Sequence, residues 1–500
     1  MSCGQSMTAR PTSKVGRAGR VLAIALLAAI VEGCGGPPLE AWHTERLRGE
    51  FTAGMAGEVG GFDGYRRLED QLFAELETKV YDRTGTGPEY ALVRYSAGSA
   101  ADPRRREPDW NRSFELPAEA PVGGVLLLHG MSDSPYSLRA LGVTLNRRGY
   151  WVVGLRLPGH GTAPSGLKYV RWEDMAAATE LAVAHLAARI DAAPVHIIGY
   201  SNGAALAVDF ALKAADGRTK PAPASLVLVS PAVGVHGAAG LAGLKDGLAV
   251  LPGLERFAWL SILPEFDPYK YNSFATNAGA QVHRLTTSLA GRIRGRARAG
   301  PIEDLPPILV FKSTVDATVS IDAVVDNLLS HLAPHRNELV LFDINRAAVA
   351  SAILIDDPGP FTNRLLGDGS LPFTLTLIAN EGPDSDRVVR RRKAPFSTEM
   401  STEPAGVSWP SGVLSLSHVA LPFPPDDPLY GREPPPDQDM IFLGQIAVRG
   451  ERGLLRFPDD WLLRLRHNPF FDLLEARTLE WLNANGRKPA EEASTRRSTR

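Results

Sequence analysis

From Gly123 onward, short runs of branched apolar residues alternate with amphipathic stretches of helical length. Helical patterns cover residues 172–190 and 320–332, for example. Because strands that are separated by helices pair in parallel, the alternation predicts an α/β fold whose mainly parallel central sheet is flanked by helices. The runs expected to form strands are residues 124–130, 151–159, 195–201, 225–231, 307–314 and 338–344.

Two long stretches interrupt this alternation. Residues 232–300 contain Gly-rich, aromatic and helical pieces, and we expect a lid over the carboxyl ends of the strands. Residues 347–412 carry a Gly/Pro-rich loop, a strand-like run and a basic run. An unstructured loop of this length is uncommon in a compact domain, so we expect an inserted subdomain, with a β-hairpin and a flanking helix. The remaining predicted parts are an N-terminal extension with leading strands (35–122), three core segments (123–231, 301–346 and 413–486) and a disordered tail (487–500).

The amino terminus has the composition of an export signal. Basic residues up to Arg20 precede the apolar run 21–31, which is shorter than the roughly 20 residues that a membrane-spanning helix needs. We therefore interpret residues 1–34 as a signal peptide and expect an exported protein. Glu32, Gly33 and Cys34 resemble a lipoprotein cleavage site, although Glu32 stands where a small or apolar residue is usual. If Cys34 is acylated, the protein is anchored to a membrane and faces the periplasm or the cell exterior. The alternative is cleavage elsewhere, with Cys34 lost or free.

Charge and composition exclude several other partners. The formal net charge is −2, and a nucleic-acid surface would normally show a basic excess. The basic run that begins at Arg292 is typical of a solvated helix face. No cluster of His, Cys and Asp has the spacing of metal ligands, so we expect neither a metal nor another cofactor.

A serine between two glycines follows the predicted strand at 195–201, in the sequence Gly-Tyr-Ser-Asn-Gly at residues 199–203. A strand that passes directly into a helix forces a tight turn, and the glycines remove side chains that would collide there. The Ser201 hydroxyl is then held over the sheet edge, beside the N–H groups that begin the helix. This context predicts a nucleophile. The alternative is a serine that only caps the helix.

A serine hydroxyl needs a histidine to take its proton, and the histidine needs a carboxylate to orient it. Asp316 follows the strand at 307–314 and precedes a helix, so its carboxylate can project from the same sheet edge as Ser201. Asp322 lies inside the helical pattern and lacks this placement. The alternative role for Asp316 is a helix cap.

His418 is the histidine that suits the chain order, in which acid and base follow the serine. It comes after an apolar run and begins a proline-rich loop. His331 and His335 end the helix after Asp316, on the wrong side of the sheet, and His467 adjoins the final helix. We therefore predict His418 as the base, with a structural histidine as the alternative.

Acyl transfer also requires two N–H donors for the oxyanion. One normally belongs to the residue after the nucleophile, and the other to the loop after the first core strand. These positions are Asn202 and Met131. Gly130 allows the chain to turn sharply beside the predicted site.

Taken together, residues 121–231 resemble the α/β-hydrolase superfamily, specifically bacterial carboxylesterases and monoglyceride lipase-like enzymes. The motifs that carry the resemblance are LLLHG (126–130), LRLPGHG (155–161), GYSNG (199–203) and ILVFKSTVDATVS (308–320). The resemblance implies a cofactor-free serine hydrolase that acts on acyl esters. The interval between Asp316 and His418 departs from it, being much longer than is usual in the family.

The leading functional hypothesis is therefore a carboxylic ester hydrolase that forms an acyl-enzyme on Ser201. Haloalkane dehalogenases and epoxide hydrolases of this fold carry a carboxylate in the strand-to-helix turn where this chain has Ser201, so Ser201 argues against both. A peptidase or an acyltransferase could use the same triad, and a surface-anchored binding protein could keep the fold without the chemistry.

Overall fold

The computed structural model describes residues 37–234, 255–316, 320–348, 354–355, 357–436, 441–444 and 465–486. The predicted signal peptide with Cys34 and the predicted disordered tail lie outside these ranges. Within them, no helix combines the length and the apolar character that a bilayer crossing requires.

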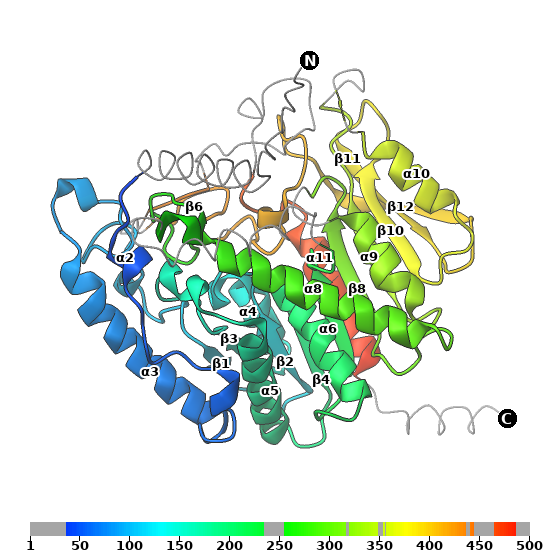
Figure 1. Ribbon diagram of the computed structural model, residues 1–500. Helices are drawn as coiled ribbons and strands as arrows, with labels where there is room; N and C mark the ends of the chain where they lie inside the picture. Colours follow the sequence, from blue (N-terminus) through cyan, green and yellow to red (C-terminus); the bar gives the residue numbers. More distant parts are fainter. Residues whose placement is uncertain are drawn as a thin grey trace, which may run out of the picture.

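Ten strands of the described chain form one central sheet, in the order β1-β3-β2-β4-β5-β8-β9-β10-β11-β12 (Figure 1). The strands from β3 across to β10 pair in parallel, whereas β1, β11 and β12 are antiparallel to their neighbours. The predicted α/β architecture is confirmed. The strand bounds are β1 (Phe114–Leu116), β2 (Gly123–Leu128), β3 (Tyr150–Leu155), β4 (Val195–Tyr200), β5 (Ser225–Val229), β8 (Ile308–Ser313), β9 (Glu338–Phe342), β10 (Thr374–Asn380), β11 (Arg387–Lys393) and β12 (Met400–Ser408).

Helices cover both faces of this sheet. Helices α5, α6 and α8 pack with residues of one strand face in the larger apolar cluster, and α4 and α11 pack on the opposite face in a second cluster. Because both faces are covered, the central strands are buried throughout and mostly apolar rather than alternating. The helix bounds are α2 (Ala41–Thr44), α3 (Gly61–Lys79), α4 (Arg139–Arg147), α5 (Trp172–Arg189), α6 (Asn202–Ala215), α8 (Thr276–Ala297), α9 (Ile321–Asn327), α10 (Gly359–Gly367) and α11 (Phe471–Asn485).

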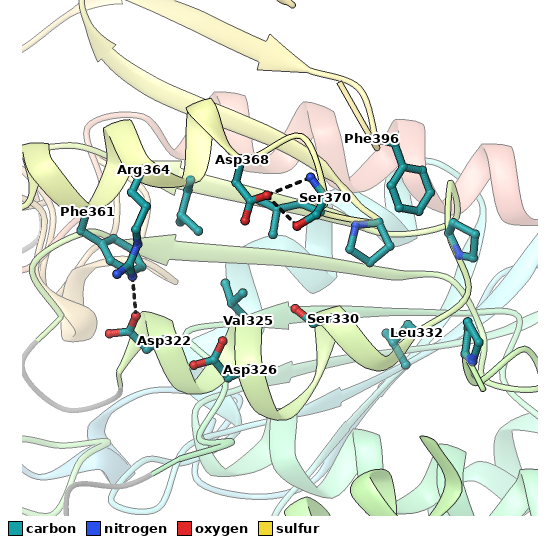
Figure 2. Close-up of a pocket in the computed structure, with 15 residues that line it drawn as sticks. Asp322, Val325, Asp326, Ser330, Leu332, Phe361, Arg364, Asp368, Ser370 and Phe396 are labelled. Carbon is teal, nitrogen blue, oxygen red and sulfur yellow. Dashed lines mark hydrogen bonds and ion pairs between the residues drawn. The ribbon is translucent and has the colours of Figure 1, made fainter. Parts of the chain in front are cut away.

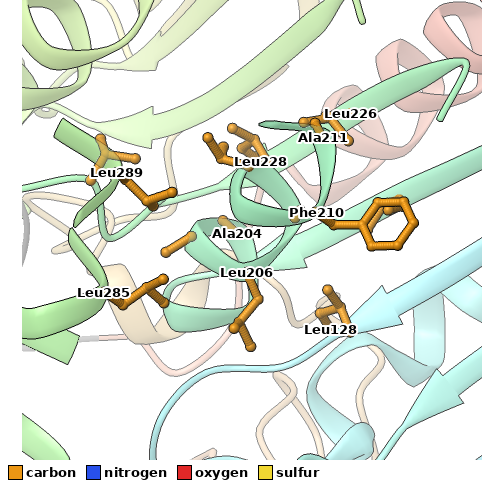
Figure 3. Packing of buried hydrophobic residues seen from close by; sticks show 14 of the residues in the cluster. Leu128, Ala204, Leu206, Phe210, Ala211, Leu226, Leu228, Leu285 and Leu289 are labelled. Carbon is orange, nitrogen blue, oxygen red and sulfur yellow. The ribbon is translucent and has the colours of Figure 1, made fainter. Parts of the chain in front are cut away.

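Helix α6 lies at the centre of the larger cluster, between the sheet and α8 (Figure 3). Its alanines, among them Ala204 and Ala211, let the helix axis approach the strands closely. Leu206 and Phe210 of α6 are buried, as is Leu285 of α8. Each such large side chain contributes about 1.5 to 3 kcal/mol on burial. The helix that follows Ser201 is therefore firmly held.

The region predicted as an inserted subdomain, residues 347–412, does not fold as a separate unit. Strand β10 pairs in parallel with β9, and β11 and β12 continue the same sheet as an antiparallel hairpin (Figure 1). The predicted hairpin and flanking helix, α10, are both present. The expectation of a separate subdomain was wrong because the free edge of β9 pairs with the strand-like run at 374–380, which extends the ladder of hydrogen bonds.

The region predicted as a lid, residues 232–300, also contributes to the core. Leu285, Leu289 and Ile293 of α8 are buried in the cluster that surrounds α6. A short two-stranded sheet precedes this helix, formed by β6 (Trp259–Ser261) and β7 (Phe274–Ala275). Residues 276–297 are thus a core helix and not a lid, and residues 235–254 lie outside the described chain.

Candidate active site

Ser201 stands in a strained turn between β4 and α6. Its backbone has φ 53° and ψ −113°, a conformation that costs a non-glycine residue about 1 to 3 kcal/mol. Hydrogen bonds on either side hold it in place: its N–H donates to the carbonyl of Val229 at 2.9 Å, and its carbonyl accepts from the N–H of Ala232 at 3.1 Å. The side chain, by contrast, is only partly buried. The turn therefore presents the hydroxyl, as the sequence pattern predicts.

The glycine after the serine permits a close approach of α6 to strand β2. A Cβ at Gly203 would lie 2.1 Å from the carbonyl oxygen of Leu128 and 2.6 Å from that of His129. The turn that follows β2 also approaches the serine, since a Cβ at Gly130 would lie 3.4 Å from the Cβ of Ser201. The predicted oxyanion loop and the predicted nucleophile are thus neighbours in space.

Asp316 and His418 are brought together from opposite sides of the long insertion. The Nδ1 atom of His418 lies 2.9 Å from Oδ2 of Asp316, and both side chains are buried. With Asp316 ionised, the imidazole donates its Nδ1–H to the carboxylate, which leaves Nε2 as the nitrogen able to accept a proton.

The path of the chain after β12 explains how His418 reaches Asp316. After β12, the chain returns along the carboxyl ends of the strands, where the N–H of Asn345 donates to the carbonyl of Leu414 at 2.7 Å. The side chain of Asn345 also donates to the carbonyl of Val413. This anchoring brings His418, the first residue of a short 3₁₀ helix (His418–Ala420), back to the middle of the sheet.

Tyr200 connects His418 to the turn that holds Ser201. Its hydroxyl donates to the backbone carbonyl of His418 at 3.3 Å, and the two rings have centroids 5.2 Å apart. Burial, together with the charges of Asp133 and Asp316, raises the pKa of Tyr200 well above its usual value, so the hydroxyl stays protonated. The residue that precedes Ser201 therefore contacts the predicted base. Any residue can occupy this position of the sequence pattern, so the sequence does not indicate that Tyr200 contacts His418.

The carboxylate of Asp316 has a second partner that the sequence pattern missed. Lys312, four positions earlier at the end of β8, places Nζ 2.6 Å from the same Oδ2 atom. Burial by itself raises the pKa of Asp316, but the charges of His418 and Lys312 outweigh burial and hold the pKa well below its usual value. Asp316 is therefore ionised at any pH at which the protein would work.

The two predicted oxyanion donors are close to Ser201. Asn202 follows it in the chain, and Met131 belongs to the turn after β2 that approaches it. Asn202 is the first residue of α6, and Met131 follows Gly130; both are buried. Neither backbone N–H donates a hydrogen bond to another residue of the described chain. The carbonyl of Met131 contacts Nε2 of His160 at 2.7 Å, which holds this peptide in one orientation. Within the described chain, both N–H groups therefore have no protein acceptor.

Asp133 is a further buried residue of the loop after β2. Its Oδ1 lies 3.2 Å from Nζ of Lys270, and its Oδ2 would lie 2.4 Å from a Cβ on Gly130. The carboxylate is therefore neutralised by a lysine from the segment that precedes α8.

The alternative acid and base residues are engaged elsewhere. Asp322 lies on α9 with a largely exposed side chain and pairs with Arg364 at 3.2 Å. His335 packs its ring against Phe396. The Nδ1 atom of His467 lies 3.1 Å from the carbonyl of Tyr430. His331 belongs to a 3₁₀ helix (Leu329–His331) whose backbone pairs with Ile302.

A cavity of about 590 Å³ opens between α9 and α10 (Figure 2). Asp322, Arg364 and Phe396 are among the residues that line it, whereas Ser201, Asp316 and His418 are not. This cavity is therefore distinct from the candidate active site. Across the described residues, no three His, Cys, Asp or Glu side chains gather in a way that could hold a metal ion.

Comparison with known proteins assigns the core of the chain to a family. The profile of the Hydrolase_4 family, described as serine aminopeptidase, S33, matches residues 119–343. This range includes Ser201, Asp316 and both oxyanion candidates, and it ends before His418. No curated protein matches the sequence.

Solved structures of lipolytic enzymes are also similar, at low identity. One of the metagenome-derived lipolytic enzymes LipS and LipT is 21% identical, over 46% of this chain and 87% of that chain, with a TM-score of 0.37. The monoacylglycerol lipase of Paleococcus ferrophilus is 17% identical, over 46% and 88% of the two chains, with a TM-score of 0.36. A monoglyceride lipase of Saccharomyces cerevisiae, solved with a substrate analogue, is 14% identical over 46% and 82%, with a TM-score of 0.35. Similarity this low does not identify a shared reaction.

Proposed function

Because this chain belongs to the α/β-hydrolase family through residues 119–343, we propose that it is a serine hydrolase that cleaves carboxylic esters through an acyl-enzyme on Ser201. The observation that carries the proposal is the buried pair of His418 and Asp316, at 2.9 Å, packed against the residue that precedes Ser201. A buried, oriented imidazole that contacts the neighbour of a strained serine supports nucleophilic catalysis, in which a base takes the proton of the serine.

In the proposed reaction, Nε2 of His418 takes the proton of the Ser201 hydroxyl as its oxygen attacks the ester carbonyl. Asp316, which is ionised, stabilises the imidazolium that forms. The N–H groups of Met131 and Asn202 donate to the oxyanion of the tetrahedral intermediate. His418 then protonates the leaving alcohol, and a water molecule activated by the same nitrogen releases the acid from Ser201.

A peptidase is the second candidate, because the matching family is described as serine aminopeptidase. An aminopeptidase must bind the positive α-amino group of its substrate, which calls for an available carboxylate. Asp133, the buried carboxylate of the oxyanion loop, is already paired with Lys270 at 3.2 Å. This carboxylate is therefore not offered to an amino group, which is why the ester is placed first.

A fluorophosphonate probe and two substrate series test the proposal. We expect the probe to label Ser201, and we expect p-nitrophenyl esters of varied chain length to be hydrolysed faster than aminoacyl p-nitroanilides. Ser201→Ala should lower kcat by about 10⁴-fold or more. Faster cleavage of the anilides would favour the peptidase, and full activity of a folded Ser201→Ala protein would exclude both enzymes.

Ser230 offers a matched control for this experiment. It is also a serine with positive φ, 43°, at the end of the neighbouring strand β5, and it is fully buried. We expect Ser230→Ala to keep both labelling and activity. Equal losses in the two variants would show that the turn, rather than the hydroxyl of Ser201, is what matters.

We further propose that the enzyme is exported and anchored through an acylated Cys34. The support is the order of basic, apolar and small residues that ends at this cysteine. Mass spectrometry of the mature protein should find a lipid on Cys34, and Cys34→Ala should release the protein into the soluble fraction. An unmodified mature amino terminus at another residue would refute the anchor without affecting the hydrolase.

A further inference from the structure

A lysine is an unusual residue for the interior of a central strand. Lys312 is fully buried in β8, between β5 and β9, and by strand alternation it shares the face of Ile308 and Val310, which belongs to the larger apolar cluster. Burying a charged ammonium group is costly unless it is paired. The ion pair with Asp316 offsets that cost, because the side chain of Asp316 is also completely buried.

Lys312 and His418 meet at a single atom of Asp316. The Oδ2 atom of Asp316 accepts from Nζ of Lys312 at 2.6 Å and lies 2.9 Å from Nδ1 of His418. When His418 takes a proton, the imidazolium would share its counter-ion with the lysine and would face the lysine's positive charge across a water-poor site. Coulomb repulsion in such a site is much stronger than in water.

Among the described residues, the other titratable groups beside this cluster are either neutral or already paired. Tyr200 remains a neutral phenol, because burial raises its pKa well above the usual value. The charge of Asp133 contributes to the raised pKa of Tyr200, and this carboxylate is paired with Lys270 on the loop before α8. Asp316 already contacts both Lys312 and His418. Lys312 is therefore a positive charge that a protonated His418 would face across the shared carboxylate.

We propose that Lys312 is a positioning residue that fixes the Asp316 carboxylate and extends the activity of His418 toward lower pH, an inference that rests on the proposed function. The imidazole can act as a base only while it is neutral. A nearby positive charge delays its protonation as the pH falls, so the acidic limb of the kcat/KM profile lies at lower pH than it would without the lysine. Since nothing in the reaction requires Lys312 to contact the substrate, its effect is transmitted through Asp316.

The test is the pH profile of ester hydrolysis for Lys312→Met and Lys312→Gln. Removing the positive charge stabilises the imidazolium. As the pH is lowered, the variants should therefore lose activity at a higher pH than the wild type does. We expect the midpoint of the acidic limb to move upward by roughly 1 to 2 pH units. Lys312→Arg keeps the charge and should leave the limb at the wild-type position. Two neutral variants are used so that the measurement survives if one of them does not fold.

Lys393 is the matched control. It is a second buried lysine at the end of a strand, β11, and its Nζ donates to backbone carbonyls of Leu365 and Asp368. Lys393→Met should lower the melting temperature without moving the limb. An unmoved limb in a folded neutral Lys312 variant would overturn the proposal, as would equal shifts in Lys312→Met and Lys312→Arg. If Ser201→Ala retains activity, the proposed function fails instead, so the two failures are distinguishable.

Discussion

His418 and Asp316 are 102 positions apart in the sequence, yet Nδ1 of the histidine lies 2.9 Å from Oδ2 of the aspartate. The intervening chain adds β9, β10, β11 and β12 to one edge of the sheet and then returns to its centre. An insertion of this length can leave an active site intact because it extends an edge strand rather than separating the carboxyl ends of β4 and β8. The contact between these two residues thus depends on the return path more than on the length of the insertion.

Asp316→Asn should lower kcat by about 10⁴-fold while KM changes little, because an amide cannot support the imidazolium and also disturbs the histidine tautomer. Asp322→Asn is the matched control, since that side chain is exposed and pairs with Arg364 on the neighbouring helix. Steady-state kinetics on both variants checks this expectation. A comparable loss from Asp322→Asn would reassign the acid.

His418→Ala should abolish ester hydrolysis, with a loss of about 10⁴-fold or more in kcat. His467→Ala should retain most of the activity, because that imidazole contacts the backbone carbonyl of Tyr430 and serves the packing of the C-terminal segment. Circular dichroism confirms that both variants are folded before their rates are compared. If the His467 variant is inactive and the His418 variant is active, the base has been misassigned.

His196 should make the protein less stable in mild acid. The ring is fully buried in β4, its Nδ1 lies 2.8 Å from the Ser225 hydroxyl, and burial lowers its pKa from 6.5 to about 4. Between these values the unfolded state binds a proton that the folded state excludes, so stability falls as pH falls from 6.5 to 4, by about 3 kcal/mol at most.

His196→Gln, which cannot be protonated, should flatten this dependence. The measurement is the urea midpoint from pH 7.5 to pH 4.5 in the variant and the wild type. Some slope should remain in the variant, because burial also lowers the pKa of His43 to about 4. An unchanged slope would show that His196 is not responsible.

Gly203→Ala should destabilise the protein by about 3 kcal/mol or more, because the new Cβ would meet the carbonyl oxygen of Leu128 at 2.1 Å and neither backbone can give way easily. Gly295→Ala, in the exposed part of α8 where no described atom beyond the adjacent helix backbone lies within 4 Å of a Cβ, should instead stabilise it by up to about 1 kcal/mol. Thermal unfolding of the two variants decides whether close approach at the elbow is required.

The sequence by itself determined the features that depend on neighbours in the chain. Apolar runs bounded by turn residues located the central strands to within a few residues, and the glycines around Ser201 predicted its strained turn. The position of Asp316 directly after a strand was enough to distinguish it from Asp322. In each case the deciding interactions are periodicity, turn geometry and backbone sterics within a few residues.

Only the tertiary structure decided which distant segments meet. That α8 packs on α6 as a core helix, and that residues 374–408 extend the central sheet, depends on which surface or strand edge remains free after the other elements have packed. The lysine in β8 is buried against Asp316, a pairing that the sequence analysis does not predict. A strand edge or a buried charge is satisfied by a partner far along the chain, and local pattern carries no information about that partner.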